Sequence, residues 1–411
     1  MRLRTTSIFL PLVPLALAGT AGAQSASGFT SPGMPRTSDQ STRFDNDFNP
    51  AIGFVLDALG SFYDGEASEE DGLELGLRSG EMNVAAWVDP TAWAYGTIVY
   101  SGEETALEEG AIHYTGLGGN STIRAGRFFV DFGKQMQAHV HDLRTVDRPA
   151  VLRTFLGDEL GGDGIQYDNW FTAGEDTVVR FSIGAFGSLV AHEHGEEEHD
   201  HGGGGHAEAE AEAVTRPDID ELALTARLTG FTSLTDNQTL QLGASMRSIP
   251  EFEFENEDYG LDADGQDSTV FGFDATWGWV DDTQTESLTI GGEFLISDGS
   301  LFAEVDDPDG TSGSGDESLD VLDGDASGFY AYVDYGWDPF NSIGVQYSQV
   351  ETLEDGLPEL DEFDVYWTHE LSEFQRLRLA FTRSELEGEV EDRIGLQYTI
   401  YLGPHAHGVN F

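Results

Sequence analysis

The segment Arg376-Leu-Arg-Leu-Ala-Phe-Thr382 decides the fold, because its side chains alternate between polar and apolar with a period of two residues. In an extended backbone, Leu377, Leu379 and Phe381 point to one side, whereas the two arginines and the threonine point to the other. Residues 394–403 repeat the pattern, with an apolar side chain at every second position. Strands of about ten residues that are apolar outside and polar inside are typical of a transmembrane β-barrel.

Strand candidates of this kind follow one another from Asn49 onward, about sixteen in all, with turn residues between them. The connections between them alternate between short and long, as in outer-membrane barrels, which have short periplasmic turns and longer outer loops. The short ones are 89–91, 116–120, 172–176, 235–237, 281–284, 337–341 and 370–373, and the long ones are 133–163, 191–218, 255–267 and 299–326. We therefore predict an all-β fold for residues 49–411, a transmembrane antiparallel β-barrel of about sixteen strands. A soluble lectin-like or carbohydrate-active β-protein is the structural alternative.

The two ends of the chain carry features of export and membrane assembly. Residues 1–23 combine two arginines, an apolar stretch and the small-residue sequence Ala21-Gly-Ala23, as expected of a signal peptide. Residues 24–48 are polar and predict a flexible periplasmic lead-in, and no later segment is apolar for the roughly 18 residues that a spanning helix needs. The final residue, Phe411, matches the terminal aromatic side chain that outer-membrane proteins present to the barrel-assembly machinery. These features predict a protein of the outer membrane of a Gram-negative bacterium, in contact with its lipid.

Composition excludes several classes of function. The chain of 411 residues has no cysteine, which excludes disulfides and thiolate metal sites and leaves His, Asp and Glu as candidate ligands. Its formal net charge of −57 excludes nucleic acid as a partner, because binding phosphates requires basic groups. Such acidity suits a saline habitat, a cation-handling role, or both. The sequence contains no Gly-x-Ser-x-Gly, His-Glu-x-x-His or phosphate-loop motif, so we predict no enzymatic activity and no catalytic residues.

The most polar long connection follows the strand candidate 121–132 and is predicted to fold toward the lumen. It spans residues 133–163, and Gly161-Gly-Asp-Gly164 is expected to turn the chain back into a return strand at 165–171. Loops of this length tend to be functional. Its candidate pore residues are Arg144, Asp147, Arg148 and Arg153, and its candidate metal ligands are His139 and His141.

The histidines are the strongest chemical signal. Both rings of a His-x-His pair in extended backbone face the same side, so His139 and His141 could share one metal ion with Asp142 or with a carboxylate opposite. Hydrogen-bonded loop residues are the alternative. The outer loop 191–218 holds five more histidines among carboxylates, at His192, His194, His199, His201 and His206. This tract predicts capture of Zn²⁺ or another divalent metal, against a solvated acidic loop with incidental histidines.

Two weaker metal signals lie elsewhere. His405 and His407 repeat the His-x-His spacing and would form a periplasmic metal pair. Two acidic stretches, at 262–265 and 307–310, resemble fragments of calcium loops but lack the later glutamate, so we expect at most loose binding of Ca²⁺. We expect no tightly bound cofactor.

Five short stretches also resemble a known family. They are 49–57, 126–133, 139–141, 147–149 and 156–157, and they are similar to plug-less, porin-like outer-membrane proteins. Members of this family often carry a His-rich outer loop and are described as zinc-related or receptor-like; the stretch 126–133 also resembles phosphate-selective porins. The resemblance implies a monomeric or trimeric barrel that admits metal ions or metal chelates. The lead-in shows no energy-coupling box, which favours passive or facilitated diffusion.

The sequence as a whole predicts a porin-like channel for the uptake of divalent metal ions, zinc above all. The outer His-rich loop would concentrate the metal, and lumen carboxylates would favour cations. The first alternative is a porin for siderophores or other metal chelates, in which Arg144, Arg148 and Arg153 would bind an anionic ligand. The second is a barrel that transports nothing and acts as a surface adhesin or sequesters metal.

Overall fold

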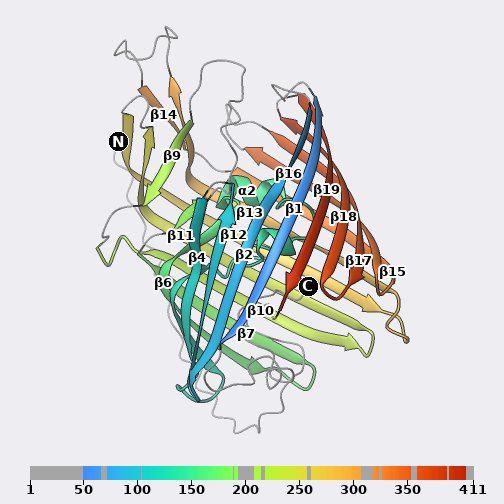
Figure 1. Cartoon of the computed structure of the whole chain (residues 1–411). Coiled ribbons are helices and arrows are strands. Elements are labelled where there is room, and N and C mark those ends of the chain that lie inside the picture. The colour runs from blue at the N-terminus through green and yellow to red at the C-terminus, as the bar shows by residue number, and fades with distance from the viewer. Residues whose placement is uncertain are drawn as a thin grey trace.

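The computed structural model describes residues 50–65, 72–102, 104–187, 189–192, 208–213, 218–256, 261–306, 318–323, 326–352, 359–386 and 388–403. Within them, sixteen antiparallel strands form a closed barrel, because each pairs with its neighbours along the chain and the last pairs with the first (Figure 1). The strands of this wall are β1 (Ala51–Gly65), β2 (Gly72–Asp89), β3 (Ala92–Ser101), β4 (Glu104–Tyr114), β5 (Ser121–Phe129), β6 (Glu159–Thr172), β7 (Thr177–Phe186), β10 (Ala223–Thr235), β11 (Gln238–Asn256), β12 (Leu261–Val280), β13 (Ser287–Asp306), β15 (Ala326–Asp338), β16 (Asn341–Thr352), β17 (Leu360–Ser372), β18 (Gln375–Leu386) and β19 (Glu389–Leu402). The predicted all-β barrel is confirmed. The expected signal peptide, the lead-in and Phe411 lie outside the described residues.

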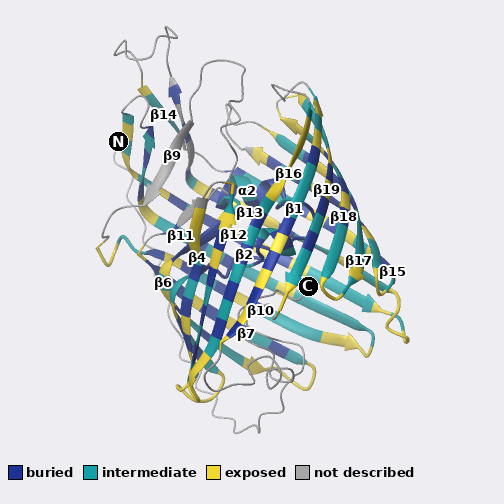
Figure 2. Ribbon diagram, in the orientation of Figure 1, coloured by how far each residue is buried: buried dark blue, intermediate teal, exposed yellow. Residues whose placement is uncertain are grey.

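The outer face of the wall is apolar and the inner face is polar. In β18, Leu379 is 44% exposed on the outside, whereas its neighbour Arg378 is 3% exposed on the inside. In β19, Ile394 and Leu396 face outward and Gln397 is buried, and Figure 2 shows the same alternation along β1. Closure of the barrel pairs the backbone groups of every wall strand, which hydrocarbon requires because it offers no hydrogen bonds.

The predicted short connections all join neighbouring wall strands, and local hydrogen bonds hold them. The turn 281–286 between β12 and β13 is organised by Asp281, which accepts hydrogen bonds from the Thr283 hydroxyl and from the backbone N–H groups of Thr285 and Glu286. The Thr283 hydroxyl and these backbone groups lower the pKa of Asp281 to about 2. Asp89 and Asp338 accept equivalent hydrogen bonds in the turns after β2 and β15. Aspartate side chains that bond nearby backbone groups favour turns, so the turn prediction had a sound physical basis.

At the other end of the barrel several strands continue beyond the wall. The predicted loop 255–267 is wrong, because β11 runs to Asn256 and β12 begins at Leu261. Strand β9 (Glu208–Ala213) pairs with both β11 and β13, and β14 (Ser318–Asp323) also pairs with β13. Phe252 and Phe254 of β11 alternate with glutamates and pack in a small apolar cluster with Ala303. This period of two residues lies just before the predicted loop and continues to Asn256, the end of β11.

The long connection between β5 and β6, residues 130–158, is called the inward segment below. The predicted turn at Gly161–Gly164 is wrong, because these residues pair with β5 as the first part of β6. The glycines instead leave room for rings: a Cβ at Gly161 would lie 3.1 Å from the Phe129 ring, and one at Gly164 would lie 2.5 Å from the Phe186 ring. The segment contains the 3₁₀ turn η1 (Val140–Asp142) and the helix α2 (Ala150–Leu156).

The inward segment carries the hydrophobic core of the molecule into the lumen, where Figure 1 shows α2 inside the barrel. Val151, Leu152 and Phe155 of α2 are buried in one cluster with inward-facing Tyr330 and Val350 of the wall. Apolar burial of this kind stabilises by about 25 cal/mol per Å² removed from water. No helix in the part of the chain that the structure describes is long and apolar enough to span a membrane.

Candidate functional site in the barrel lumen

The inward segment reaches opposite sides of the wall. At one side the backbone N–H of Gly133 donates to the Ser245 hydroxyl of β11, at 3.0 Å. At the other, Arg78 of β2 donates to the Val146 carbonyl at 2.6 Å. Strands β2 and β11 are seven positions apart in the ring of sixteen and so lie nearly opposite each other, which means that the segment crosses the lumen. Any solute that crosses the barrel must pass beside it.

Two of the predicted pore arginines stabilise the inward segment. Arg148 is buried and donates to the carbonyls of Gln135, Ala138 and Asp158. Arg153 donates to the Arg148 carbonyl at 3.0 Å and forms an ion pair of 2.5 Å with Glu362 of β17. A planar guanidinium suits several acceptors at once. These contacts favour a role in holding the backbone over the predicted role in binding an anionic solute.

Asp147 and Arg144 connect the inward segment to other strands of the wall. Asp147 forms ion pairs with Arg78 and Arg393. Burial on its own raises the pKa of Asp147, but these arginines hold it below the usual value. Arg144 forms an ion pair of 3.0 Å with Asp334 of β15. Both side chains therefore tie the segment to the barrel.

The lumen gathers the basic residues of an acidic protein. Apart from Arg127 and Arg383, every lysine and arginine in the described ranges is buried or half-buried, and these side chains lie on the inner face or on the inward segment. Carboxylates accompany them, as in the pairs Arg180–Asp168 and Arg227–Asp274. The lumen carboxylates that were expected to favour cations are thus accompanied by arginines, and the lumen has mixed charge.

His139 and His141 lie on the inward segment among carboxylates of β2 and β4. His139 Nδ1 lies 2.9 Å from Glu108 Oε2 and 3.3 Å from Glu81 Oε2, and His141 Nδ1 lies 3.3 Å from the same oxygen of Glu81. His139 Nδ1 and the two carboxylate oxygens could hold one metal ion, since all three lie within 4.8 Å of one another. Both imidazoles are buried, at 2% and 0% exposed.

An irregularity of β4 explains why consecutive glutamates both reach His139. The register between β3 and β4 shifts at Thr97/Ile98, so Glu108 is the extra residue of a bulge. A bulge changes the direction of a side chain, which lets Glu108 join Glu109 on the inner side. Glu109 Oε1 lies 3.0 Å from His139 Nε2, on the opposite edge of the ring from Glu108.

Further hydrogen bonds hold these carboxylates in place. Glu109 accepts from the Tyr95 hydroxyl at 2.6 Å, and Glu81 accepts from the Asn83 amide at 2.7 Å. Burial on its own lowers the pKa of His139, but the carboxylates of Glu108 and Glu81 raise it well above the usual value. The sequence identified the two histidines but not their three glutamate partners. The inward position of Glu81 in the alternating stretch 79–83 was the available signal.

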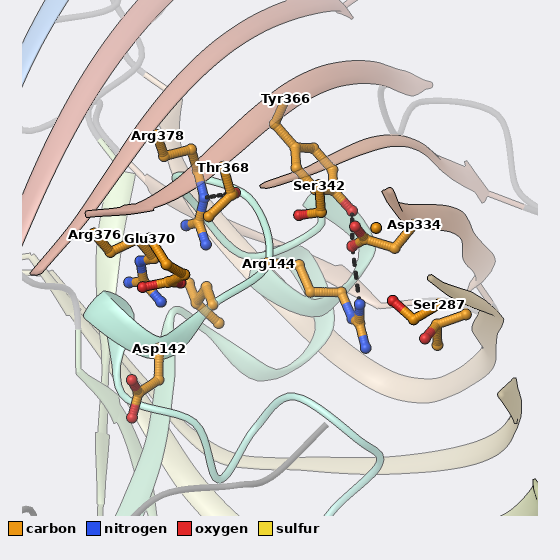
Figure 3. A pocket seen from close by; sticks show the side chains of 13 residues that line it. Asp142, Arg144, Ser287, Asp334, Ser342, Tyr366, Thr368, Glu370, Arg376 and Arg378 are labelled. Carbon is orange, nitrogen blue, oxygen red and sulfur yellow. Dashed lines mark hydrogen bonds and ion pairs between the residues drawn. The ribbon is translucent and has the colours of Figure 1, made fainter. Parts of the chain in front are cut away.

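A second site is a cavity of about 250 Å³ on the side of the short turns. Figure 3 shows Arg144, Arg376 and Arg378 around it, with Asp334 and Glu370 among the acidic groups. The Arg144 guanidinium also lies 4.2 Å from the centre of the Tyr332 ring. Among the three predicted pore arginines, Arg144 is the one that lines this cavity. Arg376 and Arg378 were noted in the sequence only as the polar face of a strand.

The other predicted metal ligands stay predictions. His192 ends the short strand β8 (Val190–His192), which pairs with the start of β6, but its side chain is not described. The remaining histidines of the outer tract and the C-terminal pair lie outside the described residues; they are His194, His199, His201, His206, His405 and His407.

The sequence and the fold were compared with those of known proteins. No family model matches the chain. A protein of Aquifex aeolicus (strain VF5), described as uncharacterized, is 27% identical over 359 residues, which cover 83% of this chain and 71% of that protein. Among solved structures, OprB of Pseudomonas putida is similar with a TM-score of 0.52, 9% identity, and coverage of 89% of this chain and 96% of that one.

Two further structures agree. The outer membrane channel DcaP of Acinetobacter baumannii has a TM-score of 0.51 at 11% identity, covering 86% of this chain and 97% of that one. A loop-deletion mutant of OmpT, an outer membrane protein of Vibrio cholerae, has a TM-score of 0.51 at 11% identity, covering 86% and 99%. Likeness at such low identity concerns the fold. The chain has the fold of porin-like outer-membrane barrels, and its solute is a separate question.

Proposed function

We propose that the protein is a porin-like channel that admits divalent metal ions, zinc above all, across the outer membrane. The observation that carries the proposal is the convergence of His139 with Glu81 and Glu108 inside the lumen, within 4.8 Å of one another. Imidazole nitrogen and carboxylate oxygen are ligands of Zn²⁺. Because the inward segment crosses the lumen, a metal ion bound here would lie on the route through the barrel.

The proposed route has two stages before release. The outer His-rich tract captures metal and raises its local concentration, and the lumen histidines form an intermediate site. Conduction then requires that the ion leave each site, so binding along the route has to be moderate or shared between neighbouring sites. Because most other lumen carboxylates form ion pairs with arginines, the glutamates beside His139 would provide the net attraction for cations.

Single-channel conductance of the refolded protein in planar bilayers tests this proposal, with and without micromolar Zn²⁺. We expect cation-selective openings that Zn²⁺ blocks, a weaker block in the variant His139→Ala, and a shift to higher Zn²⁺ concentration when residues 192–206 are deleted. His369→Asn, on the inner end of β17 and bonded to Asn341, is the matched control. Openings that Zn²⁺ does not affect would contradict the proposed role in zinc transport. Absence of conductance in every condition would favour the adhesin or metal-sequestering barrel.

A second candidate is a channel for anionic metal chelates, and the cavity lined by Arg144, Arg376 and Arg378 supports it. Guanidinium groups bind carboxylates well, and a cavity of about 250 Å³ accommodates a small polyanionic group. The test is uptake of an anionic ferric or zinc chelate by proteoliposomes. Arg144→Ala should reduce uptake, whereas Arg383→Ala, at an exposed ion pair with Asp392, should not. Equal uptake by both variants would reject this candidate.

A further inference from the structure

We propose that Glu81, Glu108 and His139 form the protein ligands of a site for a resident Zn²⁺ ion that fastens the inward segment to the barrel wall, with His141 beside it on Glu81. The inference deepens the proposed function and rests on the same residues. It makes a different claim, however: the ion binds tightly enough to stay and hold the structure, so the moderate affinity that the proposed route requires would not apply at this site. Glu81 comes from β2 and Glu108 from β4, whereas both histidines come from the inward segment.

The spacing of the ligand atoms of Glu81, Glu108 and His139 suits three protein ligands of one zinc ion. Bonds of about 2.0–2.1 Å to zinc place two ligand atoms of a tetrahedron about 3.3–3.4 Å apart. Glu81 Oε2 lies 3.3 Å from His139 Nδ1 and 3.3 Å from His141 Nδ1. Glu108 Oε2 lies 2.9 Å from His139 Nδ1, a little closer than such an edge. Nitrogen and oxygen ligands at these distances suit Zn²⁺ and exclude the larger shell of six to eight oxygens that Ca²⁺ takes.

The groups behind the ligands also suit a metal site. A histidine that binds metal through one ring nitrogen usually donates the other N–H to a carboxylate, which fixes the ring. Glu109 fills this role for His139, at 3.0 Å from Nε2. The amide of Asn83 binds the second oxygen of Glu81 at 2.7 Å, which leaves Oε2 directed at the histidines.

Electrostatics gives an independent reason for a cation here. Three glutamates meet at one place inside the barrel, with side chains 1%, 6% and 5% exposed for Glu81, Glu108 and Glu109. Carboxylates of like charge disfavour one another when buried, and a divalent ion offsets their charge more strongly than imidazolium does. The alternative explanation is a buried cluster of ion pairs between histidine and glutamate without a metal ion. A measurement of metal binding distinguishes the two explanations.

The position of the site gives it a mechanical consequence. The turn η1, which contains His141 and directly follows His139, belongs to the middle of the inward segment, away from the ends that continue into β5 and β6. A metal ion bound by residues of β2, β4 and the inward segment would cross-link the segment to the wall. Backbone pairing does not attach the segment to the wall at this point. Occupancy of the site would stabilise the barrel by an amount that grows with the logarithm of the ratio of free metal concentration to the dissociation constant. Loss of the ion would free the segment to move.

The experiment measures Zn²⁺ binding by the full-length protein refolded in detergent. Histidines 192, 194, 199, 201, 206, 405 and 407 are first replaced by asparagine, which removes the other predicted ligands. Equilibrium dialysis against Zn²⁺ with metal analysis should then give one tightly bound ion per chain. His139→Ala should weaken binding at least 100-fold, Glu109→Gln by about 10–100-fold as a group behind the ligand, and His369→Asn should leave it unchanged. Co²⁺ in place of Zn²⁺ should give the strong visible absorption of a tetrahedral ion.

Each outcome decides the inference separately from transport. Heat-dependent gel migration of each variant shows whether it folded, and the Glu109→Gln variant serves if His139→Ala does not fold. Equal Zn²⁺ affinity in the parent and in the folded variants at His139 and Glu109 would overturn the site. A tight site in a barrel that never conducts would retain the inference and reject the channel. Zinc-sensitive conductance without a tightly bound tetrahedral ion would support the channel and reject the inference.

Discussion

Arginine side chains inside the barrel act mainly as cross-links to irregular backbone. The inward segment has carbonyl groups that no strand ladder satisfies, and buried carbonyls need hydrogen-bond partners. Arg148 serves three of them from within the segment, while Arg78 and Arg378 reach Val146 and Thr145 from the wall. One guanidinium carries five N–H donors in a fixed plane, which makes it suited to this task.

Replacement of Arg148 by lysine tests this role. One ammonium cannot reach the three carbonyls that the guanidinium serves, so at least one buried carbonyl loses its donor. We expect a loss of about 1–3 kcal/mol in stability, measured by denaturant unfolding in detergent. Arg383→Lys, at an exposed pair on the outer end of β18, should change stability by less than about 0.5 kcal/mol. Equal effects would contradict the cross-linking role.

Gly133 begins the inward segment in a conformation that other residues avoid. Its φ is +54°, and a Cβ would lie 1.9 Å from Glu293 Oε2. Gly118, in a short turn, has φ of +77° but open space around it. Gly118→Ala should therefore cost only the backbone strain of about 1–2 kcal/mol, and Gly133→Ala should cost more because Glu293 must also move. Thermal unfolding measures the difference, and a larger loss for Gly118→Ala would reject this explanation.

Helix α2 is short, and packing explains its place inside the lumen better than helix propensity does. A helix of seven residues is too short to be stable alone in water. Its apolar side chains meet Leu295, Tyr330 and Val350 on the inner face of the wall. The wall therefore supplies the apolar partner that the helix needs.

Truncation of Leu152 measures that packing. Leu152 is fully buried, so Leu152→Ala should reduce stability by about 2–5 kcal/mol. Leu117→Ala, in an exposed turn, removes the same atoms without leaving a buried cavity and should be close to neutral. Denaturant titration of both variants gives the comparison. Similar losses would mean that α2 is not packed as described.

The short turn after β12 predicts a pH dependence. Hydrogen bonds from Thr283 lower the pKa of Asp281 to about 2, below the usual value for an aspartate. A lowered carboxylate pKa stabilises the folded state above the unfolded pKa, and this contribution disappears as pH falls through the folded value. Asp281→Asn should thus lower the unfolding temperature above about pH 4, and the difference should vanish toward pH 2. A difference that persists unchanged at pH 2 would contradict this.

At the scale of the whole molecule, the outer face of the barrel carries aliphatic and aromatic side chains, whereas charged side chains lie on the inner face. Phe273 of β12 is 54% exposed on the outside, between the inward residues Gly272 and Asp274. An arginine at the membrane midplane of a barrel costs about 2–4 kcal/mol, and the cost falls near the interfaces. Phe273→Arg should therefore reduce folding in lipid vesicles more than Val280→Arg at the strand end. Folding yield by gel migration is the measurement, and equal yields would contradict a lipid-facing Phe273.

Much of the barrel followed from sequence because its signals are local. Alternation in segments such as 376–382 and aspartate-bearing turns such as Asp281 depend only on neighbours in the chain, so the strands and the short connections were predictable. The loop predicted at 255–267 missed the strand residues from Leu261 onward, which pair with the end of β11, and a turn was predicted at Gly161–Gly164. In the structure Gly161 makes room for the Phe129 ring, which the chain order does not reveal.

The candidate site divides in the same way. The sequence by itself determined a closed, acidic, cysteine-free barrel with a polar segment bearing His139 and His141. Only the tertiary structure decided that Glu81 and Glu108 meet those histidines, because strand register and one bulge in β4 bring residues far apart in the chain together. The tertiary structure likewise shows that Arg148, predicted as a pore residue, is buried and donates hydrogen bonds to backbone carbonyls of the inward segment.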